Sequence, residues 1–157
     1  MWKNILIADL LLAESKYDEA LAFVGAMKAA GKSTGLNALP VFTAQRHEIA
    51  ARTLLGLADA SQGRARRRLA KRAHRQASRM LARSRESHFR GTALRLMGQA
   101  GLVLGRPDAG REVLERALGA TTKNGSLVEQ AAIAILLGVA PPPGVPGAAI
   151  AQALGRR

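Results

Sequence analysis

The sequence contains no cysteine among its 157 residues. Disulfide bonds, thiolate metal sites and cysteine nucleophiles are therefore excluded, and the composition fits a reducing compartment such as the cytoplasm. Aromatic residues are also rare, at 3%, whereas Ala and Leu dominate the 48% of the chain that is hydrophobic. Small and unbranched apolar side chains suit helices packed closely on helices, while a β-sandwich would need more Val, Ile, Thr and aromatic residues.

Long hydrophobic runs are missing as well. No stretch approaches the roughly 20 apolar residues that cross a bilayer. The apolar residues 5–13 are interrupted by Asp9 and are followed by no small-x-small cleavage site, which argues against a signal peptide. The sequence therefore predicts a cytoplasmic protein with no membrane span.

Acidic residues are scarce, with 11 Asp and Glu against 24 Lys and Arg, for a formal charge of +13. So few acids leave little material for a catalytic carboxylate pair, and no Ser, His and acid pattern stands out. The histidines His47, His74 and His88 are scattered, and no clustered acid accompanies them. We therefore expect a non-enzymatic protein with no cofactor and no metal.

Two short segments are similar to catalytic motifs but lack required residues. Residues 31–34 (GKST) match the end of a phosphate-binding loop, but Ala26 stands where that motif needs a glycine. A helix that ends at Gly31 is the better interpretation. Residues 47–48 begin a zinc-protease motif, but Ala51 replaces its second histidine.

Apolar residues recur at spacings of three and four in segments separated by turn residues, which predicts an all-α chain of seven or eight helices in three to four antiparallel hairpins. Asp18 and Ser126 are expected to cap two of these helices, Ser126 together with Glu129 in a capping box. Pro107 suits the first turn of another helix. The predicted helices span about residues 2–14, 18–31, 41–61, 64–84, 89–104, 107–121, 127–138 and 148–154.

Two regions are expected along the chain. Residues 1–140 form a helical repeat domain, because the pattern of helix, tight turn, helix and longer linker recurs within them. Residues 141–157 contain a Pro- and Gly-rich strap, a short last helix and the basic tail at 156–157.

Small residues recur at matching places in the repeated units. Ala8, Gly56 and Gly98 lie in the middle of successive first helices, where the two helices of a pair are expected to cross. Seven residues after each of these, Ser15, Gly63 and Gly105 stand in the turns between the paired helices.

These units resemble tetratricopeptide repeats. The first unit carries the phrase KYDEAL at 16–21, and the third carries Met97-Gly98, GRP at 105–107 and LERAL at 114–118. The middle unit keeps Leu55-Gly56, but its second helix is about five residues longer than the pattern allows. With periods above the usual 34 or so residues, the resemblance is closest to the longer repeats of bacterial multidomain regulators and kinases. It covers residues 2–120 and implies hairpins stacked as a short α-solenoid, with a helical bundle that is not a solenoid as the alternative.

The resemblance implies a function in protein–protein interaction. In this family the first helix of each pair lines a concave groove, which would bind a segment of a partner protein. Alternatively, the N-terminal helix, which carries Trp2 close to Ile5 and Leu6, packs on a second copy in a homodimer or on a neighbouring domain. The predicted groove residues are Ile5, Leu6, Leu12, Leu54, Leu57 and Leu102.

Basic residues concentrate in residues 64–95. On a helix, seven of them fall on one face at spacings of three and four, opposite an apolar stripe formed by Ala65, Leu69, Ala73, Ala77 and Leu81. This face flanks the predicted groove with positive charge, and the alternative function is nucleic-acid (polyanion) binding through helix 64–85. A third interpretation is that this stretch is an ordinary solvated helix, enriched in arginine by codon bias. We call the seven residues the basic face: Arg64, Arg68, Lys71, Arg72, Arg75, Arg79 and Arg83.

Overall fold

The computed structural model describes the backbone of residues 2–83, 87–124 and 126–154, and the side chains of residues 6–83, 89–123 and 126–154. Within these ranges the chain is all-helical, as predicted, and it has no strand. A helix that could span a membrane is not found in the described part of the chain. The helices are α1 (Trp2–Ala13), α2 (Tyr17–Ser33), the 3-10 helix η1 (Leu36–Ala38), α3 (Pro40–Asp59), α4 (Gly63–Arg83), α5 (Ser87–Val103), α6 (Pro107–Asn124), α7 (Leu127–Leu137) and α8 (Gly147–Leu154).

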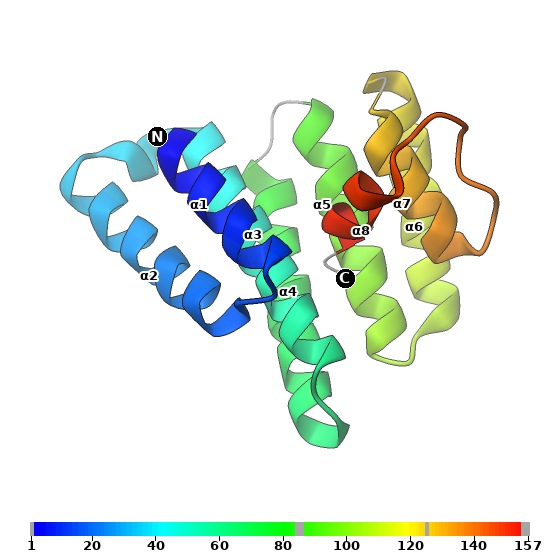
Figure 1. The fold of residues 1–157 in the computed structure, drawn as a ribbon, viewed down its shortest axis with the longest axis horizontal. Coiled ribbons are helices and arrows are strands. Elements are labelled where there is room, and N and C mark those ends of the chain that lie inside the picture. The colour runs from blue at the N-terminus through cyan, green and yellow to red at the C-terminus, as the bar shows by residue number, and fades with distance from the viewer. Residues whose placement is uncertain (1, 84–86, 125, 155–157) are drawn as a thin grey trace.

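Helices that follow each other in the chain pack together in order, from α1 and α2 at one end to α6 and α7 at the other (Figure 1). The odd-numbered helices also contact one another, α1 with α3, α3 with α5, and α5 with α7. The short helix α8 lies over the row of odd-numbered helices, in front of α5 and α7 in this view.

The hydrophobic core runs along this row as a series of connected clusters. One cluster joins α1, α2 and α3, a second joins α3, α4 and α5, and a third joins α5, α6 and α7. A smaller fourth cluster holds α8 on α7. Because each cluster involves only neighbouring helices, contacts between distant helices contribute little to the packing.

Glycines allow α5 and α6 to approach at the level of their backbones. A Cβ atom on Gly98 would lie 2.6 Å from Leu114 Cγ and 3.0 Å from the Gly110 carbonyl oxygen. The predicted crossing of a helix pair at Gly98 is therefore confirmed. At Gly56 the prediction is wrong, because this glycine faces the ring of Tyr17 on α2, which belongs to the preceding pair, rather than its own partner α4.

Several predicted helix ends differ from the structure. Gly31 does not end α2, which continues to Ser33, and the left-handed residue after it is Gly35 with φ 74°. Gly31 is needed instead for space, because a Cβ there would lie 2.7 Å from Phe42 Cε1. Pro40 begins α3 rather than lying in a linker, as a proline can in the first helical turn. Pro107 begins α6, as predicted.

The predicted side-chain caps are also wrong. Helix α2 begins at Tyr17, so Asp18 lies inside its first turn, where a negative charge is still favourable. Ser126 does precede α7 but makes no side-chain cap. Glu129, its expected partner in a capping box, pairs with Arg95 on α5 instead.

Helix α4 buries one narrow stripe and leaves the rest of its surface in solvent. Ala73 and Ala77 lie in the core, as predicted, together with Ala70 and Met80. Ala65 is exposed, contrary to the prediction, because the α3–α4 turn extends beyond the neighbouring helices (Figure 1). Residues 84–86 and the basic tail lie outside the described residues.

Candidate functional site

The residues predicted to line one apolar groove are dispersed. Leu12 is 5% exposed in the α1–α3 cluster, and Leu54 is 1% exposed in the α3–α5 cluster. Leu102 of α5 packs against the third cluster and lies beside Gly110 of α6. The prediction of an exposed apolar groove is therefore wrong for Leu12 and Leu54, which stabilise the core.

The other predicted groove residues form no continuous surface with these. Leu57 is half-buried, and the side chain of Ile5 lies outside the described residues, as does that of Trp2. Leu6 is 69% exposed, and Leu10 one helical turn later is also exposed. An apolar face of α1 is thus open to solvent, and its expected contact with a second copy or another domain stays a prediction.

The surface formed by the odd-numbered helices is instead occupied by α8. Two residues of α8 four positions apart, Ile150 and Leu154, are buried against Ala131 and Ala132 of α7. Small alanines on α7 let the short helix lie close to it. We call the surface of α3, α5 and α7 that holds α8 the α8 seat.

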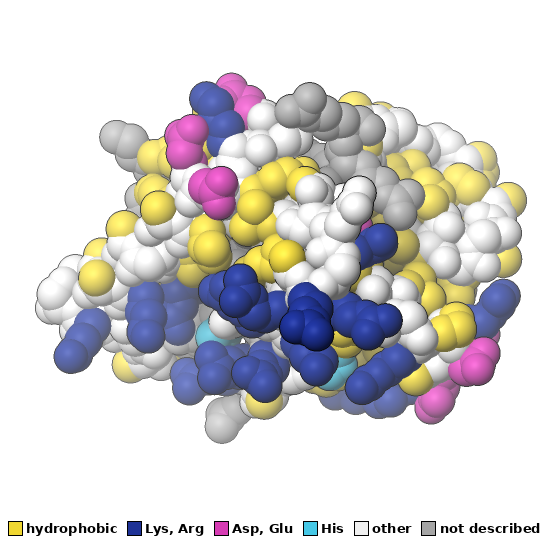
Figure 2. Space-filling model, turned by 90° about the horizontal axis from the view of Figure 1, so that it is seen from below, with side chains coloured by type: hydrophobic (Ala, Val, Ile, Leu, Met, Phe, Trp, Pro, Cys, Tyr) yellow, Lys and Arg dark blue, Asp and Glu magenta, His cyan; other side chains and the backbone are white. Residues whose placement is uncertain are grey.

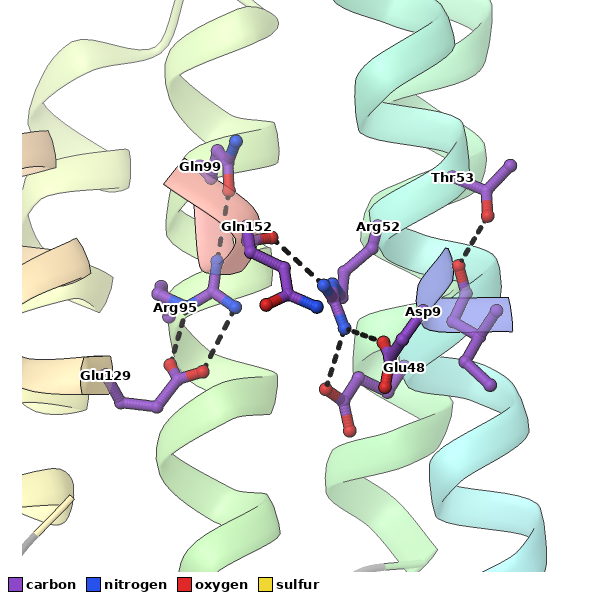
Figure 3. Close-up of polar contacts among 9 residues, drawn as sticks. Asp9, Glu48, Arg52, Thr53, Arg95, Gln99, Glu129 and Gln152 are labelled. Atoms are coloured by element: carbon purple, nitrogen blue, oxygen red, sulfur yellow. Dashed lines mark hydrogen bonds and ion pairs between the residues drawn. The ribbon is translucent and has the colours of Figure 1, made fainter. Parts of the chain in front are cut away.

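Arg52 of α3 holds α8 from one side of the seat (Figure 3). Its Nη2 donates a hydrogen bond of 3.0 Å to the carbonyl oxygen of Gln152. Its Nη1 lies 2.8 Å from Asp9 Oδ1 on α1 and 3.8 Å from Glu48 Oε1. Burial raises the pKa of Glu48, while the positive charge of Arg52 opposes that rise. The charge of Arg52 is thus balanced by two carboxylates from different helices.

Arg95 and Gln99 of α5 form the other side of the seat (Figure 3). Arg95 is 1% exposed and binds Glu129 of α7 through two atoms, with Nε–Oε2 at 2.6 Å and Nη2–Oε1 at 3.2 Å. Its Nη1 donates to Gln99 Oε1 at 3.3 Å. Gln99 Nε2 then donates to the carbonyl oxygen of Leu154 at 3.2 Å. A chain of polar contacts therefore runs from α7 through α5 to the last turn of α8.

Arg52 and Arg95 were missed as site residues by sequence reasoning. Arg95 was counted in the basic stretch, although it is buried and paired. A signal was present: each arginine interrupts the apolar middle of a first helix, a few residues before Gly56 or Gly98. A buried cation in such a place requires a partner, and in this structure the partners come from other helices.

The basic face of α4 is exposed along its length, as predicted. None of its seven residues forms an ion pair within the described part of the chain. Figure 2 shows Lys and Arg side chains gathered in a band across one side of the molecule, with Asp and Glu at one end of the band and in a separate group away from it. The band is extended by Lys28 of α2, Arg46 of α3 and Arg106 of the α5–α6 turn.

The crowding of positive charge affects the groups beside α4. Burial lowers the pKa of His47, and the nearby charges of Arg46, Arg83 and Arg79 lower it further. A hydrogen bond to Gln76 acts in the opposite direction. Burial likewise lowers the pKa of His74, helped by Arg106. Both imidazoles are therefore held in the neutral form near pH 7.

Comparison with protein-family models, curated proteins and solved structures finds no match to this chain. The resemblance to tetratricopeptide repeats therefore stays a prediction. In the described residues, no three His, Asp or Glu side chains lie close enough together to hold a metal ion.

Proposed function

We propose that this chain is a protein-interaction module of stacked helix hairpins, similar to tetratricopeptide repeats, whose α8 seat binds a short amphipathic helix of a partner protein. The single observation that carries the proposal is that the surface of the odd-numbered helices already holds a helix, α8. This differs from the apolar groove expected from the sequence, because the polar contacts come from Arg52 and Gln99.

The contacts that hold α8 are ones that another helix can also make. Arg52 and Gln99 donate to backbone carbonyl oxygens near the end of α8, and every helix leaves its last carbonyls free of partners inside the helix. The apolar contacts require only two apolar residues four positions apart, as Ile150 and Leu154 are. Recognition of a partner would therefore depend on its helical form and the spacing of its apolar residues.

The native occupant is a short helix. Helix α8 has 8 residues, too few for a stable helix without tertiary contacts. It also leaves the Nε of Arg52 buried without a hydrogen-bond partner. Helix α8 therefore depends on its contacts with the seat, and a partner helix would have to replace those contacts.

Two aspartate substitutions on opposite sides of α8 test the proposal. Ile150→Asp places a charge in the apolar contact with α7 and should release α8, whereas Gln152→Asp adds the same residue on its exposed side. A fluorescent peptide of residues 146–157 should bind the Ile150→Asp protein and bind wild type and Gln152→Asp only weakly. Equal, weak binding to all three, with α8 shown by hydrogen exchange to be released in Ile150→Asp, would rule the proposal out.

A second candidate function is nucleic-acid binding, and the exposure of the basic face favours it. Like charges three and four residues apart repel, so the face is destabilising unless an anion neutralises it. A helix of 21 residues spans about 30 Å and can follow several phosphates of a duplex. With only Phe89 near this stretch in the sequence, contact with the phosphate backbone is favoured over stacking on single-stranded bases.

The salt dependence of duplex binding tests this second candidate. Affinity for a short random duplex should fall steeply between about 50 and 200 mM salt, and Arg68→Gln should reduce the logarithmic slope by about 1. Arg111→Gln, which removes the same charge from α6, is the control and should leave the slope unchanged. Identical slopes for the two variants would mean that the basic face is not the contact surface.

A further inference from the structure

A pocket of about 320 Å³ opens between α2, α3 and α4, beside the basic face and away from the α8 seat. Two small residues, Gly25 of α2 and Ala50 of α3, both line it and leave room for it. At Gly25 an added Cβ would meet no atom within 4 Å. The volume is at the lower end of the range for small-molecule sites.

The lining of the pocket is divided by chemistry. Its apolar part comes from Leu21 and Val24 of α2 with Leu54 of α3. Its charged part comes from four cations on three helices, and none of the lining residues that the structure describes is acidic. These cations are Lys28, Arg46, Arg72 and Arg79.

Two of the polar groups at the pocket are held in place by neighbours. Arg46 Nη1 donates to Asn37 Oδ1 at 3.1 Å, and Asn37 Nδ2 donates to the backbone oxygen of Lys28 at 3.2 Å. His47 is 7% exposed, and its Nδ1 lies 2.7 Å from Gln76 Oε1. Their partners are neutral amides and not carboxylates, so the positive charge at the pocket is not neutralised.

We propose that this pocket binds a small molecule that carries a phosphate group on an apolar or aromatic body, the class to which nucleoside monophosphates belong. The planar guanidinium groups of Arg46, Arg72 and Arg79 match phosphate oxygens in geometry and charge. The apolar part beside them accommodates the body of the ligand. This inference is independent of the α8 seat and adds a small-molecule site to the proposed interaction module.

Burial and neighbouring charges affect the pKa values of two residues at the pocket. Burial lowers the pKa of Arg46, and the charge of Arg83 adds to this effect. His47 faces the same arginines, together with Arg72 and Lys28 at the pocket. A bound phosphate would offset the effect of these positive charges on the pKa of His47, although not the effect of burial, which is the larger cause.

Calorimetric titration of the full chain with adenosine monophosphate, at about 150 mM salt, tests the proposal. Inorganic phosphate and adenosine serve as separate probes of the two halves of the ligand. Adenosine monophosphate should bind more tightly than either, because only it reaches both the cations and the apolar lining. If inorganic phosphate binds as tightly as the nucleotide, or if neither binds, the proposed ligand class is wrong.

Two pairs of variants locate the site. Gly25→Leu fills the pocket without changing charge and suits a helix better than glycine, so the protein should fold and lose at least about tenfold in affinity. Arg46→Gln should also lose about tenfold, whereas Arg64→Gln, at the far end of the basic face, should lose less than about twofold. Unchanged binding by a folded Gly25→Leu protein, or equal losses in the two arginine variants, would overturn the proposal in favour of unspecific attraction by the basic surface.

Discussion

Arg95 of α5 and Glu129 of α7 form a two-point ion pair in which the arginine side chain is 1% exposed and the glutamate 16%. The pair joins the third and fourth helix hairpins and continues through Gln99 to α8. Helices α5 and α7 thus form both this ion pair and part of the α8 seat.

Removing Glu129 should destabilise the protein strongly. Glu129→Ala leaves the buried Arg95 without its counter-charge, and we expect a loss of about 3–5 kcal/mol in the free energy of unfolding, measured in urea. The double variant Arg95→Met/Glu129→Met should recover most of that loss, since no charge stays buried. As a control, Glu115→Ala breaks an exposed ion pair with Arg111 and should have little effect. A small loss for Glu129→Ala would mean that Arg95 finds water or another partner.

Two glycine substitutions should change stability in opposite directions. Gly98→Ala inserts a methyl group between α5 and α6, 2.6 Å from Leu114 Cγ, and should cost about 1–3 kcal/mol. Gly119→Ala, in the exposed part of α6 where a Cβ meets nothing within 4 Å, should gain about 0.5–1 kcal/mol. Urea unfolding of both proteins measures the difference, and a stable Gly98→Ala protein would contradict the close approach of the two helices.

Acidification should destabilise the protein partly through His47. Its folded-state pKa lies below its ordinary value, because of burial and the charges of Arg46, Arg83 and Arg79. The unfolded chain therefore binds more protons, and the stability due to neutral His47 is present above about pH 6.5 and lost as the pH falls below it. Glu48, whose pKa burial raises, acts in the opposite direction.

The contribution of His47 is isolated by comparison with His47→Gln, which cannot be protonated. Between pH 7 and pH 5, the wild-type protein should lose more unfolding free energy than the variant. Equal losses in both proteins would show that His47 titrates with the same pKa in the folded and unfolded states.

In the absence of any ligand, the protein should be more stable at high salt than at low salt, because of the basic face. Arg64, Arg68, Lys71 and Arg75 repel one another at helical spacings, and salt screens that repulsion. Arg68→Gln should raise the unfolding free energy by a few tenths of a kcal/mol at low salt and reduce the salt dependence of the melting temperature. If salt lowered the melting temperature, attractive ion pairs such as Arg52–Asp9 would outweigh the repulsion on α4.

The sequence predicted most of the helices because their signals are local. Apolar spacing, Pro107 and the left-handed glycines Gly63 and Gly105 mark elements within a few residues of themselves. The caps failed for a physical reason: Glu129 can bond to Ser126 or to Arg95, and only tertiary packing decides between them. Likewise, Gly31 and Gly56 are needed because a Cβ at either position would meet Phe42 or Tyr17, which lie on other helices.

The basic face was predictable in the same way, because one helix supplies all its residues. The α8 seat was not, since Arg52, Gln99 and the carbonyl of Leu154 come from three helices that are far apart in the sequence. The apolar groove was predicted partly from Leu12 and Leu54, which face the core. A pattern shows which face of a helix is apolar, but not which other helix covers it.

Residues 138–146, which include most of the Pro- and Gly-rich strap, connect α7 to α8, and this tether affects any competition for the seat. A short linker keeps its attached helix at an effective concentration in the millimolar range. A freely diffusing partner at micromolar concentration would have to bind about a thousand times more tightly than α8 to displace half of it. The seat would therefore respond mainly to partner helices that are themselves tethered nearby, so that proximity rather than affinity alone would determine when α8 is exchanged.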